Sequence, residues 1–298
     1  MKNTLRTTNC EQRTHRAFTL IELVVAVALL AVVFAFAGVI FRVGIDSYRI
    51  SAANAEIMQN LRAITDQLNV DFKGAISSPG GRIHFDPNKS YIDNKFIYTA
   101  ADMANRKDVR SDGIIFFANG DFQSTLQYNG NTVVGNVACI FYALANVTTY
   151  GPEEVPDPKK KILMRRQTIL TSDFSLPNYG LIDRKEYCNT QTLAGLITDP
   201  AFDANTLMDD KNLDLNNQND LVNYMAKGVD DFTIQYVGWE PSPPIIKNFN
   251  EWRPENSEIV GWPNSLYPIA FKFTFTLYDS KAVIKQGRKF TYIVYVGD

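Results

Sequence analysis

An uninterrupted apolar run near the N-terminus constrains this 298-residue chain more than any other feature. From Leu23 to Phe41 the run contains no charged residue, and its extension back to Phe18 adds a single one, Glu22. About 20 apolar helical residues are enough to cross the hydrocarbon core of a bilayer. The sequence therefore predicts one membrane-spanning helix over residues 18–41, since no other segment of the chain has this composition.

The residues before the run predict its orientation. They carry four basic side chains and one acidic one, namely Lys2, Arg6, Arg13, Arg16 and Glu11. Because basic flanks stay on the cytoplasmic side, residues 42–298 are expected to cross the membrane. A secretory signal peptide would have an apolar region of about 7–15 residues that ends in a small-residue cleavage site, and this run is longer. Hydropathy alone leaves an uncleaved signal anchor as an equal alternative.

The segment Arg16-Ala17-Phe18-Thr19-Leu20-Ile21-Glu22 distinguishes these alternatives. It resembles the processing motif of type IV prepilins and pseudopilins. The resemblance implies that a prepilin peptidase cuts between Ala17 and Phe18 and methylates the new N-terminus at Phe18. Residues 1–17 would then form a leader. The family prefers Gly before the cut, and this chain has Ala17 there.

Glu22 is the one charge inside the predicted membrane helix. A carboxylate at this depth is costly and rarely lacks a partner. In the family that the motif resembles, the residue at this position pairs with the N-terminal amine of a neighbouring subunit and sets the axial register of assembly. The resemblance implies the same assembly role for Glu22. The alternative is a stray acidic residue whose side chain reaches interfacial water.

The helix is predicted to continue beyond the membrane. Apolar residues recur at helical spacing and form one stripe, namely Ile50, Ile57, Leu61, Ile64, Leu68 and Phe72. Polar residues occupy the other faces, namely Asn54, Glu56, Gln59, Arg62, Asp66 and Asp71. We therefore expect a helix from Phe18 to about Ala75, whose second part packs on the head. Ser77-Ser78-Pro79-Gly80-Gly81 is expected to end it.

The rest of the chain predicts β-strands separated by turn-rich loops. Six strands are expected, over Ile114–Ala118, Thr132–Leu144, Ile162–Leu170, Asp230–Val237, Ile269–Tyr278 and Lys289–Val296. In the fifth, apolar residues from Phe271 to Leu277 alternate with polar ones, which is typical of a half-buried antiparallel strand. Asp279–Gly287 is expected to be the turn before the sixth. The predicted class is α+β, with a long helix packed on antiparallel sheets, the fold that pilins share.

Several short segments of the later chain follow a recognisable order. They are Leu163–Arg166, Leu221-Val222, Val229–Phe232, Tyr236, Trp239, Trp262-Pro263 and Leu266–Phe273. In this order they resemble the minor pseudopilin J of type II secretion systems. A Tyr between the Leu and the Pro, at Tyr267, is a small departure. A loop-rich insert over about Tyr187–Asn219 lies outside the pattern.

This second resemblance implies a structural role in protein export. The chain would be a single-pass protein of the bacterial inner membrane, with its head in the periplasm, at the tip of a short pseudopilus whose assembly it helps to initiate. The implied partners are the prepilin peptidase, the minor pseudopilins I and K, the major pseudopilin G and the inner-membrane assembly platform. Two alternatives stay open. One is a minor pilin of a type IV pilus or DNA-uptake system, and the other is a signal-anchored periplasmic enzyme or binding protein.

The sequence offers little support for catalysis or cofactor binding. His84 is the one histidine after the leader, and neither a Gly-rich phosphate loop nor zinc-ligand spacing occurs. A net charge of −2 does not favour nucleic-acid binding. We therefore expect no enzyme activity, no cofactor and no nucleic-acid partner. The segment Asp214–Asp220 resembles the start of a calcium loop but lacks the Gly and Glu that complete one, so a solvated polar loop is expected and calcium stays an alternative.

Cysteine placement leaves one question open. Cys10 lies in the predicted leader, which leaves Cys139 and Cys188 in the head. Disulfides form in oxidising compartments. Because sequence cannot show whether the Cα atoms come within the ~5.5–6 Å usual for a bridge, a disulfide and two free thiols are both compatible with the sequence.

Overall fold

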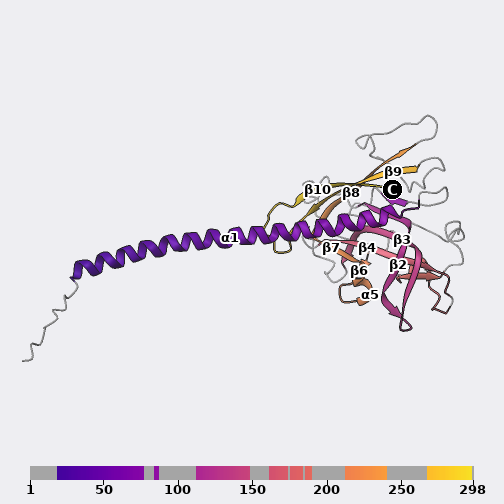
Figure 1. The fold of residues 1–298 in the computed structure, drawn as a ribbon, viewed down its shortest axis with the longest axis horizontal. Helices are drawn as coiled ribbons and strands as arrows, with labels where there is room; N and C mark the ends of the chain where they lie inside the picture. The colour runs from indigo at the N-terminus through magenta and orange to yellow at the C-terminus, as the bar shows by residue number, and fades with distance from the viewer. Residues whose placement is uncertain are drawn as a thin grey trace, which may run out of the picture. The chain divides into compact units, whose positions relative to one another are not determined.

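The computed structural model describes residues 19–76, 84–86, 112–147, 161–173, 175–183, 185–189, 212–239 and 267–296. The chain divides into two units, Met1–Ser51 and Ala52–Asp298, and one unbroken helix, α1 (Leu20–Lys73), runs through the boundary (Figure 1). The first unit consists, as far as it is described, of the first part of α1. The second unit holds the remainder of α1 and all the strands.

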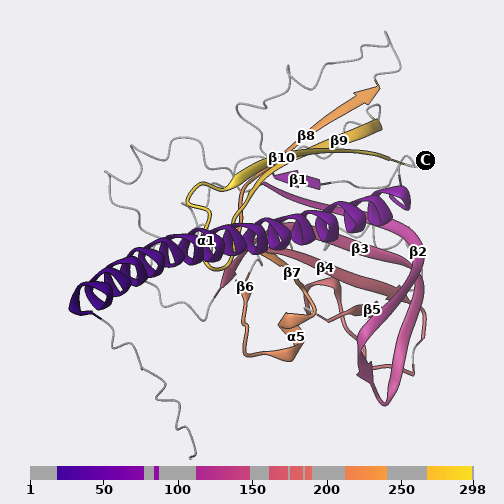
Figure 2. The same cartoon turned by 60° about the vertical axis from the view of Figure 1, so that its left-hand side comes forward.

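The second unit, the head, contains two β-sheets (Figure 2). The larger sheet has the order β1-β2-β3-β4-β5, with β6 paired to β3 and β7 to β4, and the smaller has the order β10-β9-β8. The strands of the larger sheet are β1 (His84–Asp86), β2 (Gly113–Tyr128), β3 (Asn131–Val147), β4 (Ile162–Thr171), β5 (Tyr187–Asn189), β6 (Asn212–Leu213) and β7 (Tyr224–Lys227). Those of the smaller sheet are β8 (Val229–Trp239), β9 (Tyr267–Leu277) and β10 (Arg288–Tyr295). Two short helices, η2 (Leu181–Asp183) and α5 (Gln218–Leu221), lie in the connections.

Most neighbouring strands are antiparallel. The exceptions are β5 on β4 and β6 on β3, which pair in parallel. A long helix followed by largely antiparallel sheets confirms the predicted α+β class and its pilin-like architecture.

The apolar stripe of α1 forms the centre of the head core, as predicted. Ile57, Ile64, Leu68 and Phe72 are fully buried, and Leu61 packs against them while partly buried. The ring of Phe72 lies 4.4 Å from that of Phe116 on β2 and 5.1 Å from that of Phe271 on β9. The helix is therefore in contact with both sheets. Removing a buried ring of this kind typically costs about 3–5 kcal/mol.

Two predictions about α1 were wrong. Ile50, expected in the buried stripe, is 49% exposed, because the buried face of the helix begins only at Ala53. Asp71, expected on a polar face, is 1% exposed, because polar side chains of the larger sheet meet it there. The buried surface of α1 is thus shorter and more polar than its apolar pattern indicates.

The helix ends earlier than expected. It stops at Lys73, before the predicted Ser77–Gly81 breaker, which lies outside the described residues. The carbonyl of Gly74 accepts a 2.7 Å hydrogen bond from the backbone N–H of Asn119, and Ala75 bridges to Ala118. A Cβ atom at position 74 would lie 2.0 Å from the carbonyl oxygen of Asn119. Close approach to β2 therefore ends α1 and requires glycine.

All six predicted strands are present, with shifted ends. The alternation on β9 is confirmed, because Phe271, Phe273, Phe275 and Leu277 are buried and the residues between them are half-exposed. The β9–β10 turn occupies 278–287, close to the expected Asp279–Gly287. The largest difference is β2, which continues to Tyr128 and turns through Asn129-Gly130 into β3, both with positive φ. An Asn-Gly pair is a strong hairpin signal.

Candidate assembly segment and buried polar network

The N-terminus of α1 is closed by its own side chains. The backbone N–H of Thr19 donates to Glu22 Oε2 at 2.9 Å, and the Thr19 hydroxyl donates to the same oxygen at 3.0 Å. The backbone N–H of Glu22 donates back to Thr19 Oγ1 at 3.3 Å. A Thr and a Glu three residues later form the reciprocal arrangement known as a capping box. Glu22 therefore holds the start of the helix as well as carrying its charge.

The first part of α1 presents an uncovered apolar surface. The large apolar side chains from Leu20 to Ile45 are all more than half exposed. Within the described residues, α1 is the one helix long and apolar enough to cross a membrane. In an α-helix every interior backbone group is hydrogen-bonded within the segment, which lipid demands. This segment suits a single-pass membrane anchor.

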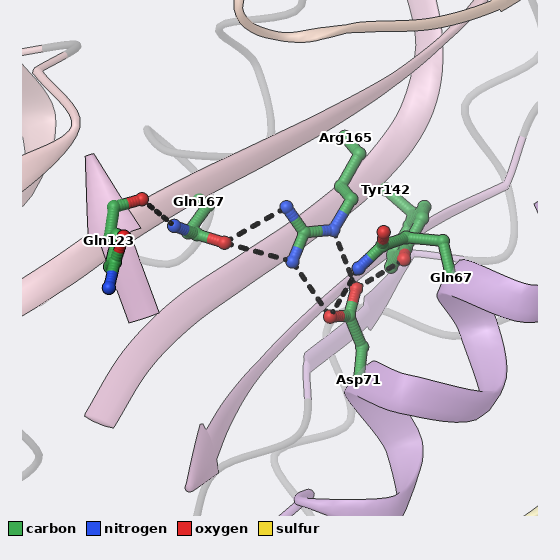
Figure 3. Close-up of polar contacts among 6 residues, drawn as sticks. All are labelled: Gln67, Asp71, Gln123, Tyr142, Arg165 and Gln167. Atoms are coloured by element: carbon green, nitrogen blue, oxygen red, sulfur yellow. Dashed lines mark hydrogen bonds and ion pairs between the residues drawn. The ribbon is translucent and has the colours of Figure 1, made fainter. Parts of the chain in front are cut away.

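The second polar feature is a buried network around Asp71 (Figure 3). Arg165 on β4 donates to both carboxylate oxygens, from Nε to Oδ2 at 2.6 Å and from Nη2 to Oδ1 at 2.7 Å. Tyr142, directly opposite Arg165 on β3, donates its hydroxyl to Asp71 Oδ2. Gln67, one turn earlier on α1, donates to Oδ1 at 3.0 Å. Three elements of the head thus converge on one carboxylate.

Outer contacts complete the network. The side-chain oxygen of Gln167 accepts from Arg165 Nη1 and Nη2, each at 3.1 Å, and its amide donates to the Gln123 carbonyl at 3.2 Å. Burial, and after it the charge of Asp71, raises the pKa of Tyr142 well above its ordinary value, so its hydroxyl remains a donor at neutral pH. Every member of the network shown in Figure 3 has a partner, as a buried polar group requires.

The spacing of Asp71 from apolar residues of α1 predicts its burial, although its charge suggested an exposed position. Asp71 follows Ile57 and Ile64 at intervals of seven residues, and both of these are fully buried. A spacing of seven places residues on nearly the same face of a helix. Arg165 lies next to buried Met164 on β4 and is 16% exposed at its side chain. A charge at a stripe position and another inside a buried strand together predict an ion pair.

Comparison with known proteins agrees with this N-terminal geometry. A family model described as the prokaryotic N-terminal methylation motif matches residues 12–38. This N-terminal motif is consistent with a type IV pilin-like protein. No curated protein and no solved structure matches the chain. The matched residues include the capping box and most of the uncovered apolar surface of α1.

The predicted processing site lies beside the described region. Ala17 and Phe18 are outside the described residues, so cleavage between them and methylation of Phe18 stay predictions. The first described residue is Thr19, the cap of α1. After the predicted cut, the new amine would lie one residue before this cap. Glu22 would then have two candidate partners, its own helix N-terminus and the amine of another subunit.

The two cysteines of the head do not form a disulfide in the structure. Cys139 on β3 and Cys188 on β5 are both buried free thiols. β4 lies between the two strands. Two strand spacings amount to about 10 Å, whereas bridged Cα atoms lie within about 7 Å. The sheet order therefore favours two free thiols, the second of the two possibilities that the sequence left open.

In the Asp214–Asp220 loop, side-chain oxygens accept hydrogen bonds from backbone N–H groups of the same loop. The N–H of Asp214 donates to Asp220 Oδ2 at 2.9 Å, and the N–H of Asn216 donates to Asp214 Oδ1 at 2.9 Å. Asn217 caps the short helix α5 in the same way. Across the described parts of the chain, no group of three or more His, Cys, Asp or Glu side chains could hold a metal ion. The backbone of His84 lies in β1, on the edge of the larger sheet.

Proposed function

We propose that this chain is a structural minor pseudopilin of a type II secretion system, and that it helps to initiate a periplasmic pseudopilus at whose tip it lies. One observation carries the proposal: a single unbroken helix has an uncovered apolar surface in its first part and forms the centre of the head core in its second. Such a helix anchors a subunit and joins it mechanically to its folded head. Type IV pilin-like proteins are structural, which agrees with this role.

The finer assignment, to the minor pseudopilin J, is supported by the smaller sheet. Two of the segments that suggested it pair with each other, with Tyr236 opposite Phe271 and Trp239 opposite Tyr267. Residues from two distant stretches of sequence therefore belong to one structural unit. Trp262-Pro263 lies outside the described residues. The Leu163–Arg166 segment supplies Arg165 to the buried network.

The proposal also assigns places and partners. Residues 1–17 are the leader, residues 18–41 the span of the inner membrane and residues 42–298 the periplasmic head. The prepilin peptidase processes the chain, and the inner-membrane assembly platform receives it. The minor pseudopilins I and K contact its head, and the major pseudopilin G forms the pseudopilus beneath the tip. Glu22 provides the charge that pairs with a neighbouring N-terminal amine.

Deletion of the gene in its native host tests the system-level assignment. We expect secretion of exported proteins to stop while surface piliation and DNA uptake continue, and we expect the intact gene to restore secretion. Loss of piliation or DNA uptake with normal secretion would instead assign the chain to a type IV pilus or uptake system. Normal behaviour in all three assays would favour the anchored enzyme or binding protein.

A further inference from the structure

The Asp71 network lies inside an otherwise apolar helix contact. Of the side chains that α1 buries in the head, Asp71 alone is charged. Its neighbours on the stripe, Leu68 and Phe72, are fully buried and have apolar side chains that form no hydrogen bonds. Apolar packing of this kind tolerates rearrangement provided that volume and pattern are preserved. The two-bond contact with Arg165 tolerates much less, because it fixes both distance and orientation.

The apolar stripe by itself is compatible with more than one axial position of α1. If the helix moved by one turn of four residues, large apolar side chains would again fill large apolar sites. Leu61 would occupy the site of Ile57, Leu68 that of Ile64, and Phe72 that of Leu68. Such a step corresponds to about 6 Å along the axis. One-turn steps of this kind are a known mode of helix displacement.

Such a step would break the polar network, and it would also move Gly74 out of its close contact with β2. Ala75 would replace Asp71 opposite Arg165 and Tyr142, and two buried donors would lose their acceptor. An uncompensated buried charge is strongly unfavourable. The ion pair therefore discriminates between axial positions that the apolar stripe accepts.

We propose that Asp71 and Arg165 are positioning residues that select one axial register of α1 on the head. Because Glu22 lies on the same unbroken helix, the register determines how much helix separates the head from Glu22. The inference rests on the proposed function, in which Glu22 pairs with another subunit. The role resembles that of a single buried polar residue that fixes register in a coiled coil at the expense of stability.

The test replaces the network by apolar side chains and measures register directly. The variant is Asp71→Leu, Tyr142→Phe and Arg165→Leu together, which removes all three polar groups. The amides of Gln67 and Gln167 lose these partners, but both side chains are partly exposed and can hydrogen-bond to water. Spin labels at exposed positions on α1 and β3, through Asn69→Cys and Val134→Cys, report the helix-to-sheet distance in the full chain in detergent. Cys10→Ser removes the leader thiol. Burial raises the pKa of Cys139 to about 12 and that of Cys188 to about 11, so neither competes for label at pH 7.

We expect one distance in the labelled chain with an intact network. The apolar variant should stay folded by circular dichroism and show a second distance, displaced by up to about 6 Å. The matched control Gln167→Leu removes outer contacts to Arg165 but keeps the ion pair, so it should retain the single distance. A folded apolar variant with one unchanged distance would overturn the inference.

A second variant covers the case in which the apolar variant does not fold. Asp71→Asn keeps the size of the side chain and removes its charge, and we expect it to show the second distance as well. A folded Asp71→Asn protein with the single distance counts against the inference. Failure of both variants to fold also counts against it, because the network would then provide stability rather than a choice of register.

Assembly is measured separately, so that the two ideas can fail independently. Cross-linking to neighbouring subunits should fall at least tenfold in any variant with the second distance. A displaced register with undiminished cross-linking would overturn the link between register and Glu22 and leave the proposed function intact. Absence of cross-linking in the unaltered chain would contradict the proposed function, whatever the distance measurement shows.

Discussion

Lys161 and Asp230 form an ion pair in the interior of the head. Their side chains are 0% and 8% exposed. Lys161 lies immediately before β4 and Asp230 lies in β8, so the contact joins the larger sheet to the smaller one. The carbonyl of Lys161 also accepts from the backbone N–H of Gly228 at 2.8 Å. A charged pair thus fixes the place where the two sheets meet.

Removal of one partner of this pair should destabilise the head strongly. We expect Asp230→Asn to lower the free energy of unfolding by about 3–5 kcal/mol, because buried Lys161 would lose the carboxylate of Asp230. The adjacent residue provides a matched control. Asp231 pairs with Lys289, whose side chain is 61% exposed, so Asp231→Asn should cost less than about 1 kcal/mol. Urea unfolding followed by circular dichroism measures the free energy of unfolding of both variants. Equal losses would contradict a special role of the buried Lys161–Asp230 pair in stability.

The capping box allows the two roles of Glu22 to be separated. Gln closes a capping box as Glu does, so Glu22→Gln should leave the helix start intact while removing the charge. We expect this variant to insert and fold normally but to lose cross-links to other subunits and to lose secretion. Thr19→Val makes the opposite change, since it removes the hydroxyl and leaves the carboxylate. It should retain most of the cross-linking.

The insertion data serve as the control for this series. Removing a carboxylate from a membrane helix makes insertion easier, so any defect of Glu22→Gln must arise after insertion. Full secretion by Glu22→Gln would show that the charge has no assembly role in this protein.

Processing is expected between Ala17 and Phe18. Mass spectrometry of the membrane-extracted protein should find a mature N-terminus at Phe18 that carries one added methyl group. Ala17→Gly restores the residue that the motif prefers and should be processed at least as completely. A protein that starts at Met1, or beyond Gly38, would contradict the prediction.

The head without the membrane segment should be a soluble folded module. A fragment over residues 47–298 keeps the whole buried stripe of α1, which begins at Ala53, and both sheets that cover it. We expect it to unfold cooperatively and to co-purify with the heads of pseudopilins I or K, as light scattering would show. A fragment that remains monomeric with every pseudopilin of its system, and turns over a substrate, would favour an enzyme.

Cysteine chemistry provides a pH-dependent prediction. Burial raises the pKa of Cys139 from 9.0 to about 12 and that of Cys188 from 9.0 to about 11. The folded protein therefore holds these protons more tightly than the unfolded chain does. The resulting stability is fully present below pH 9 and is lost as the pH rises toward 11–12. At pH 8 both thiols should resist alkylation in the folded head and react in urea, and a disulfide found by mass spectrometry would contradict this.

Much of the fold could be predicted because its signals are local. The stripe of α1 repeats over several turns, and the alternation on β9 extends from Phe271 to Leu277, so a period is visible in each. The later part of β2 has no such pattern, because residues 119–125 are mostly polar. The pairing of β2 with β3 is irregular between Gln123 and Gln127. There Glu186 accepts from the backbone N–H groups of Thr125 and Leu126, each at 2.7 Å. Because this carboxylate is some sixty residues away in the sequence, the residues of the strand itself do not predict the contact.

The candidate site likewise contains contacts that are local in sequence and contacts that are long-range. Thr19 and Glu22 are three residues apart, so their contact follows from a short motif. The partners of Asp71 lie on β3 and β4, and only the folded sheet brings Tyr142 and Arg165 together beneath the helix. The strands β5 and β6 have three and two residues, too few for any periodic signal. Long-range pairing of polar groups is the part that sequence patterns do not reveal.

The contact between Phe72 and Phe271 also has a consequence for synthesis. During translation the apolar stripe of α1 emerges first, but the strand that covers it, β9, follows about 200 residues later. Until β9 arrives, Phe72 lacks its contacts with the rings of Phe271 and Phe273. The apolar stripe of α1 therefore stays partly exposed for most of synthesis. We expect a chain truncated before residue 267 to be prone to aggregation. Burial of the apolar stripe of the first helix thus depends on the last strands of the chain.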